Sequence, residues 1–546
     1  MEKICKKCGV EFEVMNDDLK FYGRISVPEP TLCPDCRQQR RLAFRNERFL
    51  YHRKCDLTGK EIISIYNPDS PYKVYAQEEW WSDKWNPFDY GRDFDFNRPF
   101  FDQFEELTRD VPRIALVNKA NVNSDYSNWL MASKNCYLLT AARDNEDCLY
   151  SHWIWRSKDC VDCGYTYDGE LCYQCVDCSN CYNLYFSQDC SGCRDGYFLK
   201  DCANCSNCFC CVGLKEKKYH IFNEKYDKKS YEEEIKKYLP LRNEEIKEVF
   251  KKLTEAIPKV PTKYYHGYST ENCVGDYMIE CKNCFKCFDI DKSEDCRYGE
   301  SIMRCKDTVD CARTTLCELC NECLSAVNSY GVLFCIMTWF SKECMYCDGC
   351  NSCKNCFGCI GLNNKQYCVF NKQYTKDEYE KLIEKIIEHI KKTGEFGEFF
   401  PMSLSPFGYN ETVANEFYPL ERGEALKVGA KWSDYEMGAQ FHGEKVTIPD
   451  TIDKVNDEIL NKILTCEGSG KPYRVIAREL DFYRKRGVPV PLRSPNQRHK
   501  DRLALRNPRE LFERKCAKCG SEIQTTYAPG RPENVYCEEC YLKEVY

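Results

Sequence analysis

The chain has 546 residues, 43 of them cysteine, and a formal net charge of −7. At roughly 150 residues per domain, this length suggests about three or four structural units. No stretch approaches the roughly 18 apolar residues of a membrane-spanning helix, and MEKICKKCGV contains no apolar signal segment. We therefore expect a cytoplasmic protein without a membrane partner, in which dense cysteine indicates metal binding rather than disulfides.

Residues 1–80 carry two CxxC pairs that predict a zinc-ribbon module, because paired knuckles supply the four thiolates of a tetrahedral zinc site. The predicted ligands are Cys5, Cys8, Cys33 and Cys36. A second four-cysteine place in the module is degenerate and now holds Cys55, Thr58, Ala76 and Glu79. Residues 81–119 follow as a connector.

A basic run leaves the second knuckle of this module, and a related run occurs near the other end of the chain. Positive charge beside a zinc knuckle is typical of a phosphate-binding surface, so nucleic acid or a ribonucleoprotein is a predicted partner. The alternative is that these side chains pair with the chain's own acidic body. The candidate contacts are Arg37, Arg40, Arg41, Arg45, Arg48, Arg498, Lys500, Arg502 and Arg506.

Two cysteine-rich repeats, related by an offset of 148 residues, fill residues 120–226 and 267–374. Cysteines recur at steps of twelve, and a turn residue such as Asp147, Asp159, Asp189, Asp201, Asp295 or Glu343 often precedes the thiol. A twelve-residue coil that returns to the same place predicts a β-solenoid with coils about 4.8 Å apart. Residues 227–266 between the repeats are expected to be a helical connector, broken near Pro240.

Stacked coils would bring CxxC pairs together, which predicts a ladder of four-thiolate zinc sites whose sulfurs lie roughly 3.8 Å apart. His220 and Cys368 occupy matched positions, as alternative metal ligands would. Free or disulfide-bonded thiols and an iron–sulfur cluster remain alternatives. The candidate central ligands are Cys160, Cys163, Cys172, Cys175, Cys178, Cys181, Cys190, Cys193, Cys202, Cys205, Cys208, Cys211, His220, Cys344, Cys347, Cys350, Cys353, Cys356, Cys359 and Cys368.

The last third of the chain begins with an amphipathic segment, residues 375–392, that predicts a helix. Residues 393–465 are rich in Gly, Pro and aromatic side chains and are expected to form an ordered strap. Residues 466–546 repeat the first module at an offset of 461, with the first metal site degenerate and the second intact. The predicted ligands of that intact site are Cys516, Cys519, Cys537 and Cys540.

The first knuckle region, from Cys5-x2-Cys8-Gly9 to Cys33-Pro-Asp-Cys36, resembles a zinc-ribbon domain family of bacteria. The closing stretch, from Cys516 to Cys540, is similar to a second bacterial ribbon type. Nearly the whole chain resembles cysteine-rich zinc-ribbon proteins of candidate-phyla bacteria. Some of those proteins carry a CoA-transferase label, but this sequence has neither the βαβ alternation nor the Gly-rich phosphate loop of such enzymes.

We predict a mainly β fold with helical connectors, in which duplicated zinc-ribbon modules at both termini flank two tandem cysteine-rich β-solenoid-like repeats. The sequence contains no HExxH, P-loop, G-x-S-x-G or Rossmann motif, so we expect no enzyme activity. The predicted function is a zinc-binding scaffold that contacts nucleic acid through its ends and an unidentified protein through the repeats. The alternative is a metal-buffering or thiol-redox protein that uses the CxxC pairs.

Overall fold

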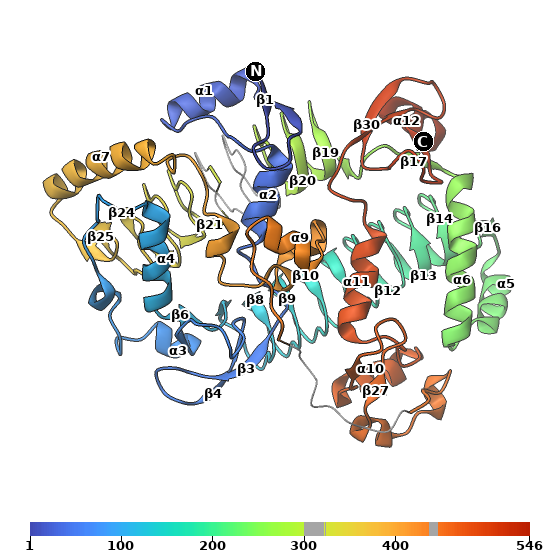
Figure 1. The fold of residues 1–546 in the computed structure, drawn as a ribbon. Helices are drawn as coiled ribbons and strands as arrows, with labels where there is room; N and C mark the ends of the chain where they lie inside the picture. Colours follow the sequence, from blue (N-terminus) through green and yellow to red (C-terminus); the bar gives the residue numbers. More distant parts are fainter. Residues whose placement is uncertain (300–320, 323, 436–445, 546) are drawn as a thin grey trace. The chain divides into compact units, whose positions relative to one another are not determined.

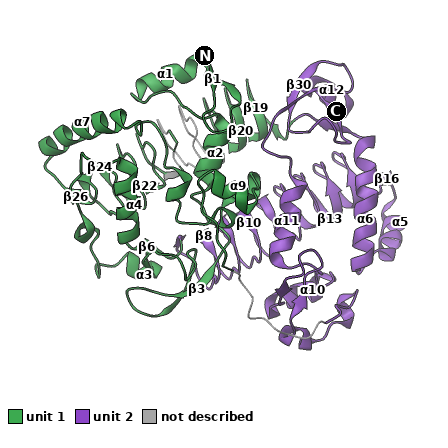
Figure 2. Ribbon diagram, viewed as in Figure 1, with its two compact units in different colours: residues 1–116, 265–435 green, residues 117–264, 436–546 purple. Residues whose placement is uncertain are grey.

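The computed structural model describes residues 1–299, 321–322, 324–435 and 446–545 (Figure 1). Parts of the predicted second repeat (300–320 and 323) and of the predicted strap (436–445) lie outside these described residues. Helices make up 26% of the chain, and the strands are short, so the protein is mixed rather than mainly β. The chain forms two compact units, residues 1–116 with 265–435 and residues 117–264 with 436–546 (Figure 2).

Each unit combines one terminal module with one cysteine-rich repeat, although module and repeat are not neighbours in sequence. Unit 1 joins the N-terminal module to the second repeat, and unit 2 joins the first repeat to the C-terminal module. The predicted strap is divided, because its first part belongs to unit 1 and its last part to unit 2. The chain therefore passes between the units at residues 116–117 and 264–265, and again between the described residues 435 and 446.

The first repeat in unit 2 is a series of short parallel strands. They are β7 (Asn118–Lys119), β8 (Asn128–Met131), β9 (Thr140–Arg143), β10 (His152–Trp155), β11 (Gly164–Tyr167), β12 (Tyr182–Tyr185), β13 (Arg194–Lys200), β14 (Ser206–Val212) and β15 (Lys218–Ile221), closed by the antiparallel β16 (Glu224–Lys225). Partners are twelve residues apart along the ladder, as in Asn128 with Thr140 and Thr140 with His152. Isolated parallel bridges such as Glu170 with Tyr182 continue this register between β11 and β12.

The backbone turns once in every three residues of this repeat. Every third residue from Ala120 to Phe222 has a positive φ, including Gly192 and Gly213. The turn residues predicted before the thiols, Asp147, Asp159, Asp189, Asp201, Asp295 and Glu343, all lie at this position, which confirms that prediction. Asn and Asp tolerate the left-handed region better than other side chains, which explains their frequency there.

Most residues that follow a left-handed position are buried in the interior of the repeat, from Ser127 to Cys211 in particular. Cysteine is common there, and the Cys160 thiol donates to the carbonyls of Lys158 (3.3 Å) and Gly169 (3.4 Å). Serine takes equivalent places, and Ser151 Oγ accepts from the Cys163 amide at 3.0 Å. Small side chains with a donor suit this interior because backbone carbonyls line it, and a few leucines such as Leu184 complete the core.

The remaining elements of unit 2 surround the first repeat. The helices are α5 (Lys228–Glu234), α6 (Asn243–Ala256), α10 (Ala477–Arg486), α11 (Pro495–Leu505) and α12 (Glu538–Val545). The strands are β17 (Pro261–Lys263), β27 (Leu464–Thr465), β28 (Pro472–Tyr473), β29 (Phe512–Lys515), β30 (Glu522–Thr525) and β31 (Asn534–Tyr536). Phe250 on α6 packs edge-on against the stacked rings of Phe186 and Phe198, which are 4.9 Å apart.

Unit 1 holds the corresponding elements of the other module and repeat. The helices are α1 (Asn16–Arg24), α2 (Pro34–Leu42), α3 (Gln77–Trp80), α4 (Phe100–Asp110), α7 (Lys376–Lys392), α8 (Val413–Phe417) and α9 (Arg422–Lys427). The module strands are β1 (Glu2–Ile4), β2 (Glu11–Glu13), β3 (Tyr51–Lys54), β4 (Glu61–Ser64), β5 (Val74–Tyr75) and β6 (Arg113–Ile114). The repeat strands are β18 (Gly267–Tyr268), β19 (Val274–Ile279), β20 (Phe285–Asp291), β21 (Ser325–Val327), β22 (Met337–Trp339), β23 (Cys350–Asn351), β24 (Lys354–Phe357), β25 (Gln366–Val369) and β26 (Lys372–Gln373).

One helix of unit 1 confirms a prediction from the sequence, and one aromatic contact follows the duplication. The helix α7 spans the predicted segment, begins with a Thr375–Glu378 capping box and buries Ile383, Ile386 and Ile390. The stacked pair Phe334 and Tyr346, 4.9 Å apart, matches Phe186 and Phe198 at the 148-residue offset. The duplication seen in the sequence is therefore retained in the packing of the described residues.

Candidate metal centres

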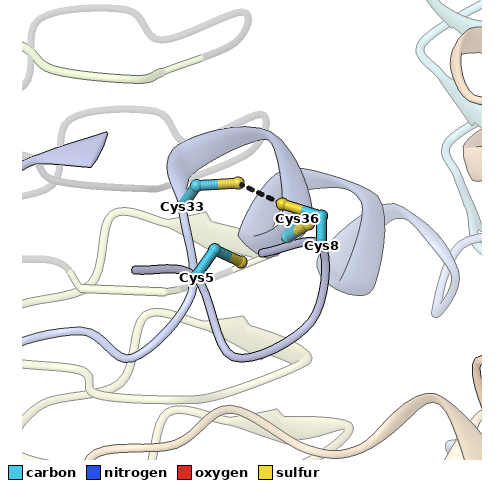
Figure 3. A group of neighbouring side chains, drawn as sticks. All are labelled: Cys5, Cys8, Cys33 and Cys36. Carbon is cyan, nitrogen blue, oxygen red and sulfur yellow. Dashed lines mark hydrogen bonds between the residues drawn. The ribbon is translucent and has the colours of Figure 1, made fainter. Parts of the chain in front are cut away.

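The N-terminal four-cysteine group lies where a hairpin meets the start of a helix. Cys5 and Cys8 flank the turn between β1 and β2, and Gly9 closes that turn with a φ of +73° that suits glycine. Cys33 caps α2 and Cys36 lies in its first turn, behind Pro34 at the position where helices accept proline. Figure 3 shows the four side chains turned toward a common point.

The sulfur geometry of this group fits a tetrahedral ion. All four Sγ atoms lie within 4.8 Å of one another, and those of Cys8 and Cys33 are 3.7 Å apart (Figure 3). A tetrahedron of thiolates at about 2.3 Å from zinc has edges of roughly 3.8 Å. The structure therefore brings the four predicted ligands together into a group able to hold a metal ion.

Hydrogen bonds make part of this group acidic. The Cys36 thiol donates to Cys33 and lowers the pKa of Cys33 to about 5, whereas the same contact raises the pKa of Cys36. Burial opposes ionisation of Cys5, but several backbone amides together outweigh it, so the pKa of Cys5 is lowered. A metal ion needs thiolates, and this environment supplies negative charge before the ion arrives.

The C-terminal group has the same chemistry in a more open setting. The Sγ atoms of Cys516, Cys519, Cys537 and Cys540 also lie within 4.8 Å of one another, and those of Cys519 and Cys537 are 3.8 Å apart. Backbone amides lower the pKa of Cys516 to about 6 against the opposing effect of burial. Three cysteines of the N-terminal group are buried, whereas only Cys516 is buried in the C-terminal group.

The two degenerate places hold single thiols in intact knuckle turns. Cys55 Sγ accepts from the Ala76 amide at 3.3 Å, and Cys516 Sγ accepts from the Cys537 amide at the same distance. The backbone of the knuckle is therefore kept where the ligands are lost. Cys466 is likewise buried, with Ser469 and Ser494 hydrogen-bonded to its sulfur, which helps to lower its pKa to about 7 against the opposing effect of burial.

The predicted central ligands are buried side chains, all of them thiols except the imidazole of His220. Among the described residues, no three central cysteines have sulfur atoms all within 4.8 Å of one another. These positions lend no support to the zinc ladder, which stays a prediction for metal analysis to test.

His220 and Cys368 occupy the same interior position of the two repeats, as the sequence indicated. His220 pairs with Cys208 across the ladder, and Cys368 pairs with Cys356. His220 Nδ1 lies 2.8 Å from the Lys218 carbonyl, and the Cys368 thiol donates to the Gln366 carbonyl at 3.4 Å. Both side chains thus contact the carbonyl two residues earlier, as the interior cysteines do.

The basic residues predicted to bind nucleic acid are mostly buried inside their own units, so that assignment needs correction. Arg37, Arg40, Arg41, Arg45, Arg498, Arg502 and Arg506 are each at most 8% exposed. Arg40 pairs with Glu322 and Glu398 at 2.8 Å, and Arg506 pairs with Asp177 at 2.8 Å. Arg48 is half-buried, and only Lys500 is exposed.

These arginines attach α2 and α11 to the repeats of their own units, a role that the search for metal ligands missed. Arg498 contacts Asp162 (2.9 Å) and Glu479 (3.1 Å), and Arg502 contacts Asp162 at 2.9 Å. The Arg498 guanidinium lies 5.2 Å from the Tyr150 ring, and that of Arg37 lies 5.5 Å from the Tyr298 ring. The offset of 461 relates Arg37 to Arg498, and the offset of 148 relates Tyr150 to Tyr298. Applying both duplications to the sequence together could therefore have indicated this contact between module and repeat.

Comparisons with known proteins do not assign the chain to a group. No protein-family model matches it, and no curated protein matches it. Within the described residues, no helix is both long and apolar enough to cross a membrane. The structure therefore establishes two groups of four cysteines, each of which can hold a metal ion.

Proposed function

We propose that this chain is a zinc-binding structural protein in which each terminal module holds one Zn²⁺. The observation that carries the proposal is the pair of four-cysteine groups with sulfur–sulfur distances of 3.7 and 3.8 Å. Four thiolates favour zinc, and a site with four protein ligands has no open position for a substrate. Such closed sites are structural, so the proposal includes no enzyme activity.

The repeats are proposed to be β-solenoids that the modules anchor. In the first repeat, parallel pairing at a twelve-residue register and a turn at every third residue both support a chain that coils around one axis. The buried arginine contacts give each module a specific place on its repeat. A rigid solenoid held by a metal-stabilised module could act as a scaffold that binds other proteins. Free thiols persist in the reducing cytoplasm, so we place the protein there.

Metal analysis tests this proposal. Native mass spectrometry and elemental analysis of the purified full-length chain should find two zinc ions, one for each four-cysteine group. Cys36→Ser and Cys540→Ser should each remove one ion, and Cys160→Ser, in the first repeat, should remove none. A metal-free chain with all thiols reduced would refute the proposal, and substantially more than two ions would support the ladder instead.

A further inference from the structure

We propose that the C-terminal metal group is a latch that holds the chain segment connecting unit 2 to unit 1. This inference rests on the proposed zinc function and adds a role for one of its two sites. The segment includes β17 and ends at Tyr264, the last residue of unit 2 before the chain enters unit 1 at residue 265. Figure 1 places β17 beside α12 and the C-terminal end of the chain.

The connecting segment is held by the C-terminal ribbon through backbone and side-chain contacts. In the parallel pair β17–β31, Thr262 lies opposite Val535, and the Tyr264 amide donates to the Tyr536 carbonyl at 3.0 Å. Thr525 on β30 donates to the Tyr264 carbonyl at 2.6 Å. Lys263 pairs with Glu538 on α12 at 2.9 Å.

The strand that receives the segment runs directly into the metal ligands. Tyr536, the last residue of β31, precedes Cys537, whose amide donates to Cys516 Sγ at 3.3 Å. The Ala517 amide of the first knuckle donates to the Val535 carbonyl at 2.9 Å. A two-stranded ribbon this short is marginal by itself, so the bound ion must supply the free energy that orders it.

The other module contains a matched connection that needs no metal. There β5 pairs in parallel with β6, and the Ala115 amide donates to the Tyr75 carbonyl at 3.0 Å. The offsets relate β5 to β31 and β6 to β17, with the pairing shifted by one residue. Because the metal place beside β5 is degenerate, something else must hold this connection.

Aromatic packing replaces the metal at that matched connection. Trp80 is 5% exposed, and its indole N–H donates to the Pro112 carbonyl at 3.0 Å, immediately before β6. Trp85 packs against Trp80 and Tyr75, each with ring centroids 5.7 Å away. One connection is thus permanently packed, whereas the other depends on an ion bound by thiolates that solvent and chelators reach.

Hydrogen exchange of the full-length chain tests the latch. Cys519→Ser removes an exposed ligand of the C-terminal group, and the matched control Cys8→Ser removes the exposed ligand of the N-terminal group. In Cys519→Ser the zinc count should fall by one, and exchange in residues 258–264 should accelerate on the order of tenfold or more. Exchange in residues 110–116 should stay unchanged, and Cys8→Ser should alter neither segment.

The outcomes separate the latch from the zinc proposal. If Cys519→Ser loses one zinc and residues 258–264 keep their protection, the latch is wrong and the zinc function stands. If the zinc count of Cys519→Ser equals that of the unaltered chain, both are wrong. Equal acceleration in both segments would also overturn the latch, since it would report general unfolding. Titrating the unaltered protein with EDTA gives the same readouts without a substitution, should the variant not fold.

Discussion

Replacing Arg498 by methionine should loosen the attachment of α11 to the first repeat. The Arg498 side chain is 3% exposed and bridges Asp162 and Glu479. Methionine keeps much of the length and apolar stem but removes the charge, so the two carboxylates lose a shared partner. The exposed Lys500 lies on the same helix, and Lys500→Met is the matched control.

The size of the effect follows from the partners that remain. Removing one member of a buried ion pair costs about 3–5 kcal/mol when the other charge is left alone. Here Arg502 still contacts Asp162, and the hydroxyls of Tyr150 and Tyr483 still donate to Glu479. We therefore expect Arg498→Met to lower the local opening free energy by about 3 kcal/mol, the lower end of that range. This corresponds to roughly a hundredfold change in the local opening equilibrium.

The loss should also depend on pH. Burial already raises the pKa of Glu479, and Arg498 is the strongest influence that lowers it. Without Arg498 the folded-state pKa rises further above the unfolded value, so the folded state binds the proton more tightly. The deficit is then greatest at neutral and alkaline pH and shrinks as the pH falls through the folded-state pKa.

Hydrogen exchange across residues 495–505 and 149–163 measures the loss of local stability in Arg498→Met. A local measurement is needed because a chain of several units does not unfold in one step. Arg498→Met should lose protection in both segments, and Lys500→Met should change the opening free energy by less than about 0.5 kcal/mol. A double-mutant cycle with Asp162→Asn gives the coupling between the two side chains. If Arg498→Met and Lys500→Met behave alike, the reasoning about the buried charges is wrong.

Three further predictions concern the first repeat. Asn180 has a φ of +52°, so Asn180→Val should destabilise this part of the repeat by about 1–2 kcal/mol, and Asn180→Gly should be nearly neutral; thermal unfolding and exchange at residues 173–186 distinguish them. Phe198→Ala should lower the free energy of unfolding by about 3–5 kcal/mol, because Phe198 is fully buried. It should also increase hydrogen exchange in α6, because Phe198 packs against Phe250 of that helix, and unchanged protection of α6 would contradict this role. Cys160→Ala should weaken the packing of the repeat while the zinc count stays at that of the unaltered chain; loss of zinc would support the zinc ladder.

The cysteine pattern determined the local structure of the repeats to a large degree. The step of twelve and the acidic residues before the thiols correctly indicated where the backbone turns, because the left-handed region restricts side-chain choice at each turn. Spacing along the chain did not fix the distance between the sulfur atoms of paired strands. That distance depends on how each side chain is oriented in the folded repeat, and no three central sulfurs of the described residues lie within 4.8 Å of one another.

The terminal metal groups were predictable because their ligands lie within short turns. Each CxxC pair is fixed by local knuckle geometry, and only the approach of two knuckles had to be inferred. The basic runs were misleading because composition gives charge but not location. Arg40 and Arg506 are far in sequence from the carboxylates that they contact, so nothing local shows that they are buried.

By itself, the sequence determined the duplications, the twelve-residue step with its turn residues before the thiols, and the two four-cysteine groups, since all of these follow from spacing along the chain. Only the tertiary structure decided which module belongs with which repeat. The N-terminal module packs with the second repeat and the C-terminal module with the first. The physical reason is that this pairing depends on contacts between residues hundreds of positions apart, such as Arg502 with Asp162 and Arg40 with Glu322, and local propensity carries no information about them.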